Sequence, residues 1–347
     1  MTGSERTRAA LEGRWPDRRP VMLHNFMPAA REAGLTMKAF RSSPENAARA
    51  FIEAAERYDL DGVLVDIDTA TVAGALGARV DLPEDEPARV SGPRLSSLDQ
   101  ARHLGPPPDL ACDERIAIWV ETCRLVKAHF GRDKFVRGNC DQAPFSLASM
   151  LRSPAEWMMD LAAASAGGPG GEGDGPVFAL LEYCAGAALG FMRLVAATGV
   201  DMLSHGDSPA GPGLISPAMY RRYAAPFEKR LAEEAGRLGL PWLLHICGDT
   251  TAILADMAGT GADALELDSK TGLRAIHDVC ASKLALFGTV DPVGVLRDGS
   301  PELAAARTRE LLDVYRDSPR LVLNAGCALP PDTPAENIRS LVAAARA

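Results

Sequence analysis

Short apolar segments alternate with longer amphipathic segments along the whole chain. The short segments have the length and apolar content of buried strands. The longer ones have helical spacing, and those at 43–58, 216–239 and 300–316 begin with Ser-Pro, a pair that favours a helix start. We expect eight strands: PVMLHN (20–25), DGVLVDID (61–68), KFVRGNCD (134–141), DMLSHGD (201–207), PWLLHICG (241–248), DALELD (263–268), LALFGTVDP (284–292) and LVLNAGCAL (321–329). Strand–helix alternation indicates a parallel sheet, and eight such units predict a single (β/α)8 TIM barrel.

One barrel domain accounts for nearly all of the 347 residues, of which 47% are hydrophobic and 24% charged. We expect residues 1–18 to form an N-terminal extension and residues 19–347 to form the barrel. The stretch AGGPGGEGDGP at 166–176 predicts a flexible loop between helices. The proline-rich segment 81–112 follows the second strand and is expected to fold over the barrel mouth.

Charge and cysteine content narrow the class of protein. The 37 basic and 46 acidic residues give a net charge of −9 without a dense basic cluster, which disfavours nucleic acid as a partner. We expect every apolar stretch to be shorter than the ~20 residues of a membrane span, and therefore expect no membrane partner. Seven scattered cysteines do not have the spacing of a disulfide framework. We therefore expect a cytoplasmic protein with free thiols.

Polar residues gather at the carboxyl ends of the predicted strands, where barrel enzymes hold their reactive groups. These residues are His24, Asn25, Asp66, Asp68, Asn139, Asp141, His205, Asp207, His245, Cys247, Glu266, Asp268, Asp291 and Cys327. Residues i and i+2 share one face of a strand. His245 and Cys247 are therefore expected to point together into the mouth, and His205 and Asp207 likewise. For any single residue, a structural strand cap is as good an interpretation as a catalytic role.

The pair in LLHICGDT, His245 and Cys247, has three interpretations. A nucleophilic Cys–His pair needs a hydrogen bond that neighbours on one strand face rarely make. A polar residue beside a buried thiol is the plainest alternative. A metal site needs a further soft ligand, which Cys327 in NAGCALPP supplies from the last strand. Two thiolates and one imidazole select zinc and leave its fourth position open, as in catalytic sites.

Several longer motifs carry a resemblance to a known family. HICGDTTAIL, NAGCALPPDTPAENI and GLISPAMYRRYAAPFEKRL resemble the zinc-dependent corrinoid:thiol methyltransferases of the uroporphyrinogen decarboxylase superfamily. The likeness extends from about residue 19 to the C-terminus and implies a (β/α)8 barrel. It implies that His245, Cys247 and Cys327 bind zinc. Glu266 is the first candidate for a fourth ligand and Asp207 the second.

The resemblance also implies an activity. We expect methyl transfer between a corrinoid, carried by a separate corrinoid protein, and a small thiol or other acceptor bound at Zn²⁺. Coenzyme M is the best-known acceptor of the family. Asp66 and Asp68 match the region of the aspartate that holds the tetrapyrrole in the decarboxylases. The remaining candidates are mouth residues for proton handling or for binding the cofactor: His205, Asp207 and Asp291 for the first, and His24, Asn25 and Asn139 for the second.

Three alternatives remain open from the sequence. In the first alternative, a zinc-containing barrel alkylates a thiol without a corrinoid. In the second, the protein is a barrel that binds a corrinoid or a partner protein without turnover. A metal-free decarboxylase is disfavoured, because the decarboxylases of the superfamily carry an arginine-rich first strand. Here Arg31 is the only arginine between Arg19 and Arg41. Since the decarboxylases pair as dimers, the resemblance also allows a homodimer.

Overall fold

A computed structural model describes residues 1–167 and 174–347. Its central feature is a sheet of seven parallel strands, which neighbour one another in chain order. The strands are β1 (Gly62–Val65), β4 (Phe135–Gln142), β5 (Met202–Gly206), β6 (Trp242–Ile246), β7 (Ala264–Leu267), β8 (Ala285–Val290) and β9 (Leu321–Ala325). Each overlaps a predicted strand. The predicted TIM-barrel class is therefore confirmed, with one change at the first strand.

The first predicted strand, 20–25, is reduced to a single bridge. Val21 pairs in parallel with Leu323 of β9, and the amide of Asp61 donates to the Val21 carbonyl on the other side. This segment therefore lies between β9 and β1 and closes the sheet into a barrel. It stays short because Pro20 has no amide hydrogen, and because the amide of His24 donates to the Asn324 side chain instead of a strand carbonyl.

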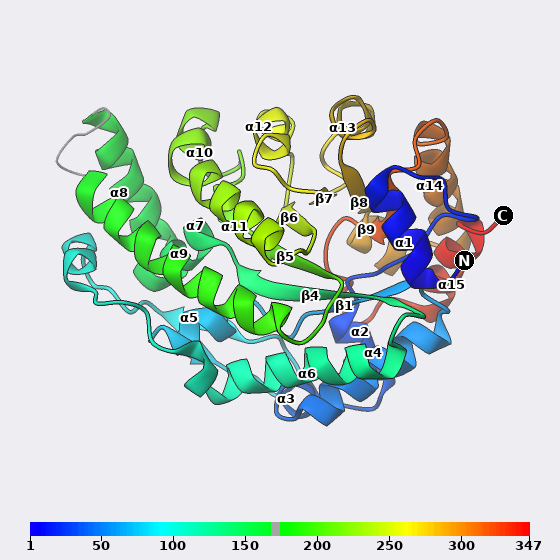
Figure 1. The fold of residues 1–347 in the computed structure, drawn as a ribbon, viewed down its shortest axis with the longest axis horizontal. Coiled ribbons are helices and arrows are strands. Elements are labelled where there is room, and N and C mark those ends of the chain that lie inside the picture. The colour runs from blue at the N-terminus through cyan, green and yellow to red at the C-terminus, as the bar shows by residue number, and fades with distance from the viewer. Residues whose placement is uncertain (168–173) are drawn as a thin grey trace.

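Helices surround the sheet, as the ribbon shows (Figure 1). They are α1 (Gly3–Glu12), α2 (Phe26–Glu32), α3 (Met37–Arg41), α4 (Pro44–Arg57), α5 (Thr71–Ala75), α6 (Glu114–Phe130), α7 (Pro144–Arg152), α8 (Pro154–Ala166), α9 (Asp174–Ala196), α10 (Pro217–Tyr223), α11 (Ala225–Arg237), α12 (Leu254–Ala258), α13 (Leu273–Cys280), α14 (Pro301–Val314) and α15 (Ala335–Ala344). The predicted helix 216–239 is two helices divided at Ala224, because Pro226 stands at the start of α11.

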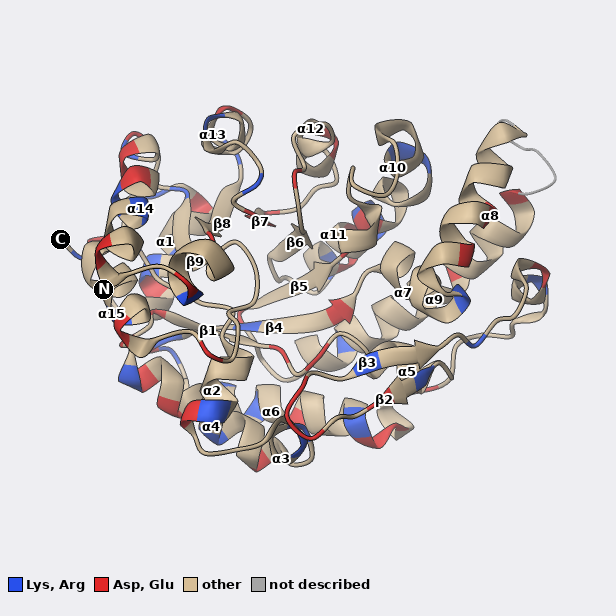
Figure 2. Cartoon of the chain, turned by 180° about the vertical axis from the view of Figure 1, so that it is seen from behind, with Lys and Arg blue, Asp and Glu red and all other residues tan. Residues whose placement is uncertain are grey.

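The structure describes the predicted proline-rich segment 81–112 in full and the predicted flexible loop 166–176 only in part. The proline-rich segment after β1 contains a short antiparallel hairpin of β2 (Arg79–Asp81) and β3 (Arg89–Gly92), followed by the 3-10 turns η1 (Leu98–His103) and η2 (Leu110–Cys112). Of the predicted flexible loop 166–176, residues 168–173 lie outside the described part of the chain. Acidic and basic residues are interspersed along the outer helices (Figure 2).

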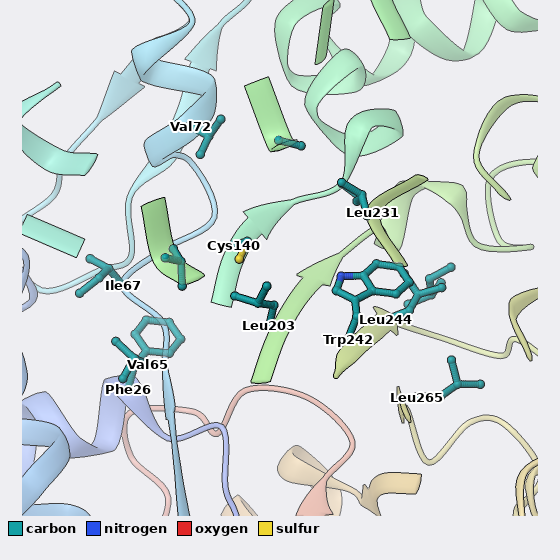
Figure 3. Packing of buried hydrophobic residues seen from close by; sticks show 14 of the residues in the cluster. Phe26, Val65, Ile67, Val72, Cys140, Leu203, Leu231, Trp242, Leu244 and Leu265 are labelled. Carbon is teal, nitrogen blue, oxygen red and sulfur yellow. The ribbon is translucent and has the colours of Figure 1, made fainter. Parts of the chain in front are cut away.

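Two hydrophobic clusters follow from strand alternation. The outer cluster lies between the strands and the helices, where Leu203, Trp242 and Leu244 pack around Cys140 and Leu231 (Figure 3). The inner cluster fills the barrel itself: Met22, Leu64, Phe135, Met202, Leu243, Ala264, Ala285, Phe287 and Val322, together with Ala10 of α1. Two residues further along these strands the inward-facing positions are polar, except in β8, where Phe287 follows Ala285 and the polar Thr289 comes next. The barrel interior is therefore apolar below and polar towards the mouth.

The predicted N-terminal extension packs tightly against the lower end of the barrel. Ala10 of α1 belongs to the inner cluster, and a Cβ on Gly3 would lie 2.3 Å from the Asp61 carbonyl oxygen. The Asp61 carboxylate accepts hydrogen bonds from the Arg6 and Arg18 guanidinium groups, at 2.9 and 3.2 Å, and from the Val21 amide at 3.0 Å. Residues 1–18 therefore hold the closing segment in place.

The side chains of β5 alternate in the opposite sense from the prediction. Met202 lies in the inner cluster, so Ser204 faces inwards, and His205 and Asp207 face the helices. His205 Nδ1 accepts a hydrogen bond from Trp242 Nε1 at 3.0 Å. Asp207 accepts from the amide and hydroxyl of Ser146 on α7. The expectation that these two side chains point into the mouth is wrong. Met202 faces inwards, so the even-numbered residues of β5 face the interior and the odd-numbered ones face the helices.

Helix α9 corrects the expectation about apolar stretches. Its 23 residues are long and apolar enough to span a membrane by length and composition alone. However, 56% of its most apolar window is buried inside the protein. Val177, Leu181, Phe191 and Val195 belong to the outer cluster. Its hydropathy is therefore explained by packing against the barrel.

The Asp61 cluster generates a stability prediction. Asp61→Ala leaves the Arg6 guanidinium and the Val21 amide without their buried acceptor, and we expect the free energy of unfolding to fall by about 3 kcal/mol. Asp17→Ala removes an exposed carboxylate that pairs with the same arginine and is expected to cost less than about 1 kcal/mol. Urea unfolding followed by circular dichroism measures both. Equal losses would show that α1 does not hold the barrel end.

His205 generates a pH prediction. Burial lowers the pKa of His205 to about 3, so the folded protein keeps this ring neutral, whereas the unfolded chain protonates it near pH 6.5. The unfolded state then binds more protons below pH 6.5, so stability is lost as pH falls from that value towards 3. Between pH 7 and pH 5 we expect wild type to lose about 2 kcal/mol more than His205→Gln. Parallel unfolding curves for the two proteins at both pH values would contradict this.

Candidate metal centre

Three soft donor atoms meet at the mouth end of the barrel. His245 Nε2 lies 3.0 Å from Cys247 Sγ, the two sulfur atoms of Cys247 and Cys327 are 3.5 Å apart, and Cys327 Sγ is 3.9 Å from His245 Nε2. All three residues keep part of their surface exposed. Within residues 1–167 and 174–347, this is the group of His, Cys, Asp or Glu side chains whose donor atoms can hold one metal ion.

Strand alternation places the first two donors. Leu243 of β6 lies in the inner cluster, so His245 and Cys247, two and four residues further, face inwards as well. His245 Nδ1 lies 3.1 Å from the Glu266 backbone carbonyl of β7, an acceptor that holds the Nδ1–H tautomer and leaves Nε2 for the cluster. The Cys247 amide donates to Ser208 Oγ at 3.2 Å. The expectation that this pair points together into the mouth is confirmed.

Cys327 reaches the cluster because glycine precedes it. Two strands, β7 and β8, separate β9 from β6, so the chain after β9 has to pass close over the end of β7. A Cβ on Gly326 would lie 2.7 Å from the Leu267 carbonyl oxygen and 2.8 Å from Asp268 Cα. Both are backbone atoms that cannot move aside cheaply. The absence of a side chain at Gly326 therefore allows Cys327 to stand beside Cys247.

The donor groups alter one another's protonation. The Cys327 thiol donates to Cys247 and His245 lies beside it, so the pKa of Cys247 falls to about 3 despite burial. The same contact with Cys247, together with burial, raises the pKa of Cys327. Burial disfavours protonation of His245, but the neighbouring Cys247 charge outweighs it and raises the His245 pKa to about 9. The site therefore stabilises one thiolate with protein groups alone.

Glu266 does not join the donor atoms. Its carboxylate lies on the opposite side of the His245 ring, with Oε1 3.5 Å from Nδ1. Oε2 is paired with the Arg137 guanidinium and accepts from Asn324 Nδ2 at 3.1 Å. Although burial opposes ionisation, the Arg137 charge outweighs it and lowers the pKa of Glu266. The geometry therefore does not support Glu266 as the fourth metal ligand, and Asp207 faces the helices.

A polar layer between the inner cluster and the donors was not predicted from the sequence. Arg137 of β4 donates to Ser204 Oγ at 2.8 Å as well as to Glu266, and Ser204 donates to Asn139 Oδ1 at 3.2 Å. Of these residues, only Asn139 and Glu266 were singled out as candidates. Arg137 stands two positions after Phe135 and Asn324 two after Val322, both in the inner cluster, so the strand period places both side chains inside the barrel.

His24 and Asp66 extend this layer from the first strand and β1. His24 Nε2 is 2.6 Å from Asp66 Oδ2, and His24 Nδ1 is 3.8 Å from Glu266 Oε1. Asp66 is 2% exposed and the His24 side chain 13%. Asn25, the next residue, is buried and stands before α2 without a side-chain hydrogen bond that caps the helix. The structure thus brings His24 and Asp66, but not Asn25, into contact with the layer that carries His245.

Asp68 and Asp291 have local structural contacts instead. Asp68 accepts from the Ala70 amide and the Thr71 hydroxyl at the start of α5, and burial raises its pKa. Asp291 accepts from the amides of Val293 and Gly294 and caps the short π-helical turn η4 (Pro292–Arg297). Their positions at strand ends are thus accounted for by the helices that begin there.

The buried pair behind β5 is distinct from the donor cluster. Burial raises the pKa of Asp207 to about 6, and burial with the Asp207 charge raises that of Glu228 on α11. Glu228 accepts from the Tyr220 hydroxyl. The backbone amide of Asp207 donates to the His245 carbonyl of β6 at 2.8 Å. This contact fixes the end of β5 against β6.

Comparison with known proteins gives relatives of two kinds. The chain is 27% identical to the methylcobamide:CoM methyltransferase MtaA of Methanosarcina barkeri, over 99% of this chain and 97% of that protein. It is 28% identical to MtbA of Methanosarcina mazei, over 67% of this chain and 64% of that protein, so it spans less than two thirds of MtbA. It is also 26% identical to the uroporphyrinogen decarboxylase of Syntrophotalea carbinolica, over 96% and 94% of the two chains.

A solved structure and a family model cover the whole chain. A methyltransferase from Methanosarcina mazei superposes with a TM-score of 0.88 over 100% of this chain and 98% of that one, at 24% identity, which supports the fold. The model for the uroporphyrinogen decarboxylase (URO-D) family matches residues 2–347. The match includes α1, in agreement with its packing against the barrel end. The chain belongs to the uroporphyrinogen decarboxylase (URO-D) family.

Proposed function

We propose that this protein is a zinc-dependent methyltransferase that moves a methyl group between a corrinoid and a small thiol. The observation that carries the proposal is the convergence of His245, Cys247 and Cys327 at the barrel mouth. The relatives named as methylcobamide:CoM methyltransferases support the same reaction class. Because the family also contains decarboxylases of similar identity, the choice between the two activities rests on this cluster.

The donor set matches the requirements of zinc. Tetrahedral zinc with bonds of about 2.3 Å to sulfur and about 2.0 Å to nitrogen separates its ligand atoms by roughly 3.5–3.8 Å. The three separations here, 3.0, 3.5 and 3.9 Å, lie close to that range. Thiolate and imidazole donors favour zinc over magnesium or calcium. Three protein ligands leave one coordination position for a substrate, as in catalytic zinc sites.

Bound zinc would lower the pKa of an acceptor thiol from its usual ~8.5, so that the sulfur is a thiolate at neutral pH. The protein's own groups keep that sulfur electron-rich. Two cysteine thiolates balance the charge of a divalent cation, and His245 is held in one tautomer by the Glu266 carbonyl. In the polar layer below, Arg137 is paired with Glu266, and the inner cluster closes the barrel beneath it. The thiolate sulfur would then attack the methyl carbon, so that a C–S bond forms while the bond between the methyl group and the corrinoid breaks and its electron pair leaves with the corrinoid.

The partner and location follow as further parts of the proposal. We place the corrinoid on a separate protein that docks at the mouth, where Leu214 after β5 and Val293 after β8 are exposed apolar side chains. All seven cysteines are free, which is consistent with a reducing cytoplasm. Each donor residue keeps part of its surface exposed, and we propose that the acceptor is a small thiol such as coenzyme M, which stands in the names of the relatives.

Metal content and methyl transfer test the proposal directly. We expect about one zinc per chain by elemental analysis under reducing conditions, and loss of zinc in Cys247→Ser and Cys327→Ser. Cys112→Ser, which removes an exposed thiol, is the matched control and should keep its zinc. The loaded protein should demethylate methylcobalamin in the presence of coenzyme M, followed by absorbance. Wild type without zinc would refute the proposal, and zinc without methylcobalamin turnover would favour alkyl transfer that uses no corrinoid.

The approach at Gly326 gives a second prediction. Gly326→Ala places a Cβ against the backbone of Leu267 and Asp268, so the chain end has to move and Cys327 with it. We expect zinc affinity, measured by competition with a chromogenic chelator, to fall about 10–100-fold. Gly213→Ala, in a loop where a Cβ meets nothing within 4 Å, is the control and should bind as wild type does. Wild-type affinity in Gly326→Ala would show that Cys327 reaches the site without this close contact.

A further inference from the structure

We propose that Ser208 is a positioning residue for selectivity: its hydroxyl, together with the Ala328 amide, keeps the protein's own cysteine sulfurs from accepting the methyl group. The inference rests on the proposed transfer of a methyl group to a thiol at the donor cluster. That site would bring three sulfur atoms together, those of Cys247 and Cys327 and that of the acceptor. Only the acceptor sulfur has to react.

Ser208 contacts Cys247 through two different atoms. Its Oγ accepts a hydrogen bond from the Cys247 backbone amide at 3.2 Å. The side chains of the two residues also form a hydrogen bond, from the hydroxyl to the sulfur. A serine hydroxyl has one hydrogen to donate and lone pairs that accept, so both bonds can exist at once. The amide thus holds the oxygen in place, and the hydroxyl hydrogen is left for the sulfur.

The 3-10 turn that begins at Ser208 is held against the end of β6. Just before it, the Asp207 amide donates to the His245 carbonyl at 2.8 Å. Just after it, a Cβ on Gly211 would lie 3.4 Å from the Cys247 carbonyl oxygen, and the Gly211 amide donates to the Ser208 carbonyl at 3.0 Å. Backbone contacts on both sides of Ser208 therefore fix its hydroxyl beside the sulfur.

The contact with Ser208 is compatible with a metal ion at the donor cluster. Two other side chains contact Cys247 Sγ: His245, with Nε2 at 3.0 Å, and Cys327, with Sγ at 3.5 Å. Both are ligands in the proposed zinc site, so their lone pairs would be directed at the metal. Ser208 belongs to the chain after β5 and supplies none of the three soft donors. Its hydrogen bond to the Cys247 sulfur can therefore persist in the zinc-loaded protein.

The second cysteine sulfur has a corresponding donor in the backbone. The Ala328 amide forms a hydrogen bond with the Cys327 sulfur. The next amide, that of Leu329, donates to the His24 carbonyl at 2.8 Å and so anchors this part of the chain. Each cysteine sulfur therefore accepts a hydrogen bond from a group that is not a metal donor. A third sulfur that enters from the mouth takes part in neither of these two contacts.

Hydrogen bonds of this kind lower the reactivity of a thiolate, because they stabilise its negative charge and nucleophilicity falls with basicity. The reaction that they disfavour is attack of a cysteine sulfur on the methyl carbon. In that reaction a C–S bond forms, the bond between the methyl group and the corrinoid breaks, and its electron pair leaves with the corrinoid. The product is S-methylcysteine, a neutral thioether in place of a thiolate ligand, which would end turnover.

Methylation of the protein itself tests the inference without a corrinoid. Zinc-loaded protein is treated with methyl iodide, and S-methylation of Cys247 and Cys327 is followed by mass spectrometry. The two residues lie in separate tryptic peptides, 238–270 and 321–339, each with a single cysteine. In Ser208→Ala we expect Cys247 to react about 3-fold faster than in wild type. Cys327 should react at the wild-type rate and is the internal reference.

Three further variants separate the hydroxyl from the packing around it. Ser208→Thr keeps a hydroxyl and should react as wild type does. Ser208→Val has the shape of threonine without the hydroxyl and should react as Ser208→Ala does. Ser269→Ala removes an exposed hydroxyl that donates to Asp268, and it is the matched control with wild-type reactivity at both cysteines.

The outcomes separate the two proposals, since zinc content is measured on the same samples. A wild-type protein that holds no zinc would refute the proposed function and this inference with it. A wild-type rate at Cys247 in zinc-loaded Ser208→Ala would overturn the inference alone. Equal acceleration at both cysteines, or acceleration in Ser208→Thr, would indicate loosened packing and overturn it as well. Loss of zinc from both Ser208→Ala and Ser208→Val would show that the hydroxyl serves metal binding instead of selectivity, which also contradicts the inference.

Discussion

The buried ion pair between Arg137 and Glu266 is the interaction on which the upper half of the barrel depends. The two side chains are 3% and 1% exposed and come from β4 and β7, which are not neighbours in the sheet. Removing two charges from water costs several kcal/mol per ion, and only close pairing with further hydrogen bonds offsets that cost. Ser204 and Asn324 supply those bonds. The pair therefore links β4, β5, β7 and β9 across the interior.

The donor cluster inherits its order from this pair. Because Arg137 keeps the Glu266 carboxylate on the inner side of the His245 ring, the imidazole presents Nε2 to the two sulfur atoms. A carboxylate free to rotate would compete for the same position. The backbone of β7 contributes a second constraint, since its Glu266 carbonyl lies at hydrogen-bond distance from His245 Nδ1 and its end is the surface over which Gly326 passes. One strand thus positions donor side chains that come from β6 and from the chain after β9.

The sequence predicted the barrel and the three donors because both depend on local period and residue type. Strand alternation placed His245 and Cys247 on one face. Cys327 was assigned to the same site because a thiolate is a soft ligand and this residue stands at the end of the last strand. Alternation failed at β5, where the inward register could not be read: Ser204 and Gly206 face the interior, and His205 and Asp207 face the helices. Asp68 and Asp291 were read as mouth residues, since a helix cap and a catalytic carboxylate look alike at a strand end.

What the sequence could not supply is contact across the barrel. Arg137 looked like one basic residue within a strand, and Asn324 like part of an apolar run, because nothing local shows that both reach Glu266. The same holds for His24 and Asp66, which are 42 residues apart. A family that contains both decarboxylases and methyltransferases on one fold makes these contacts decisive, because function depends on the site and not on the barrel. Here the guanidinium of Arg137, inside the barrel, is paired with Glu266, whereas the two thiols and the imidazole face the mouth. An interior of this kind is suited to a metal ion and a small neutral thiol, and poorly suited to a substrate with many carboxylates.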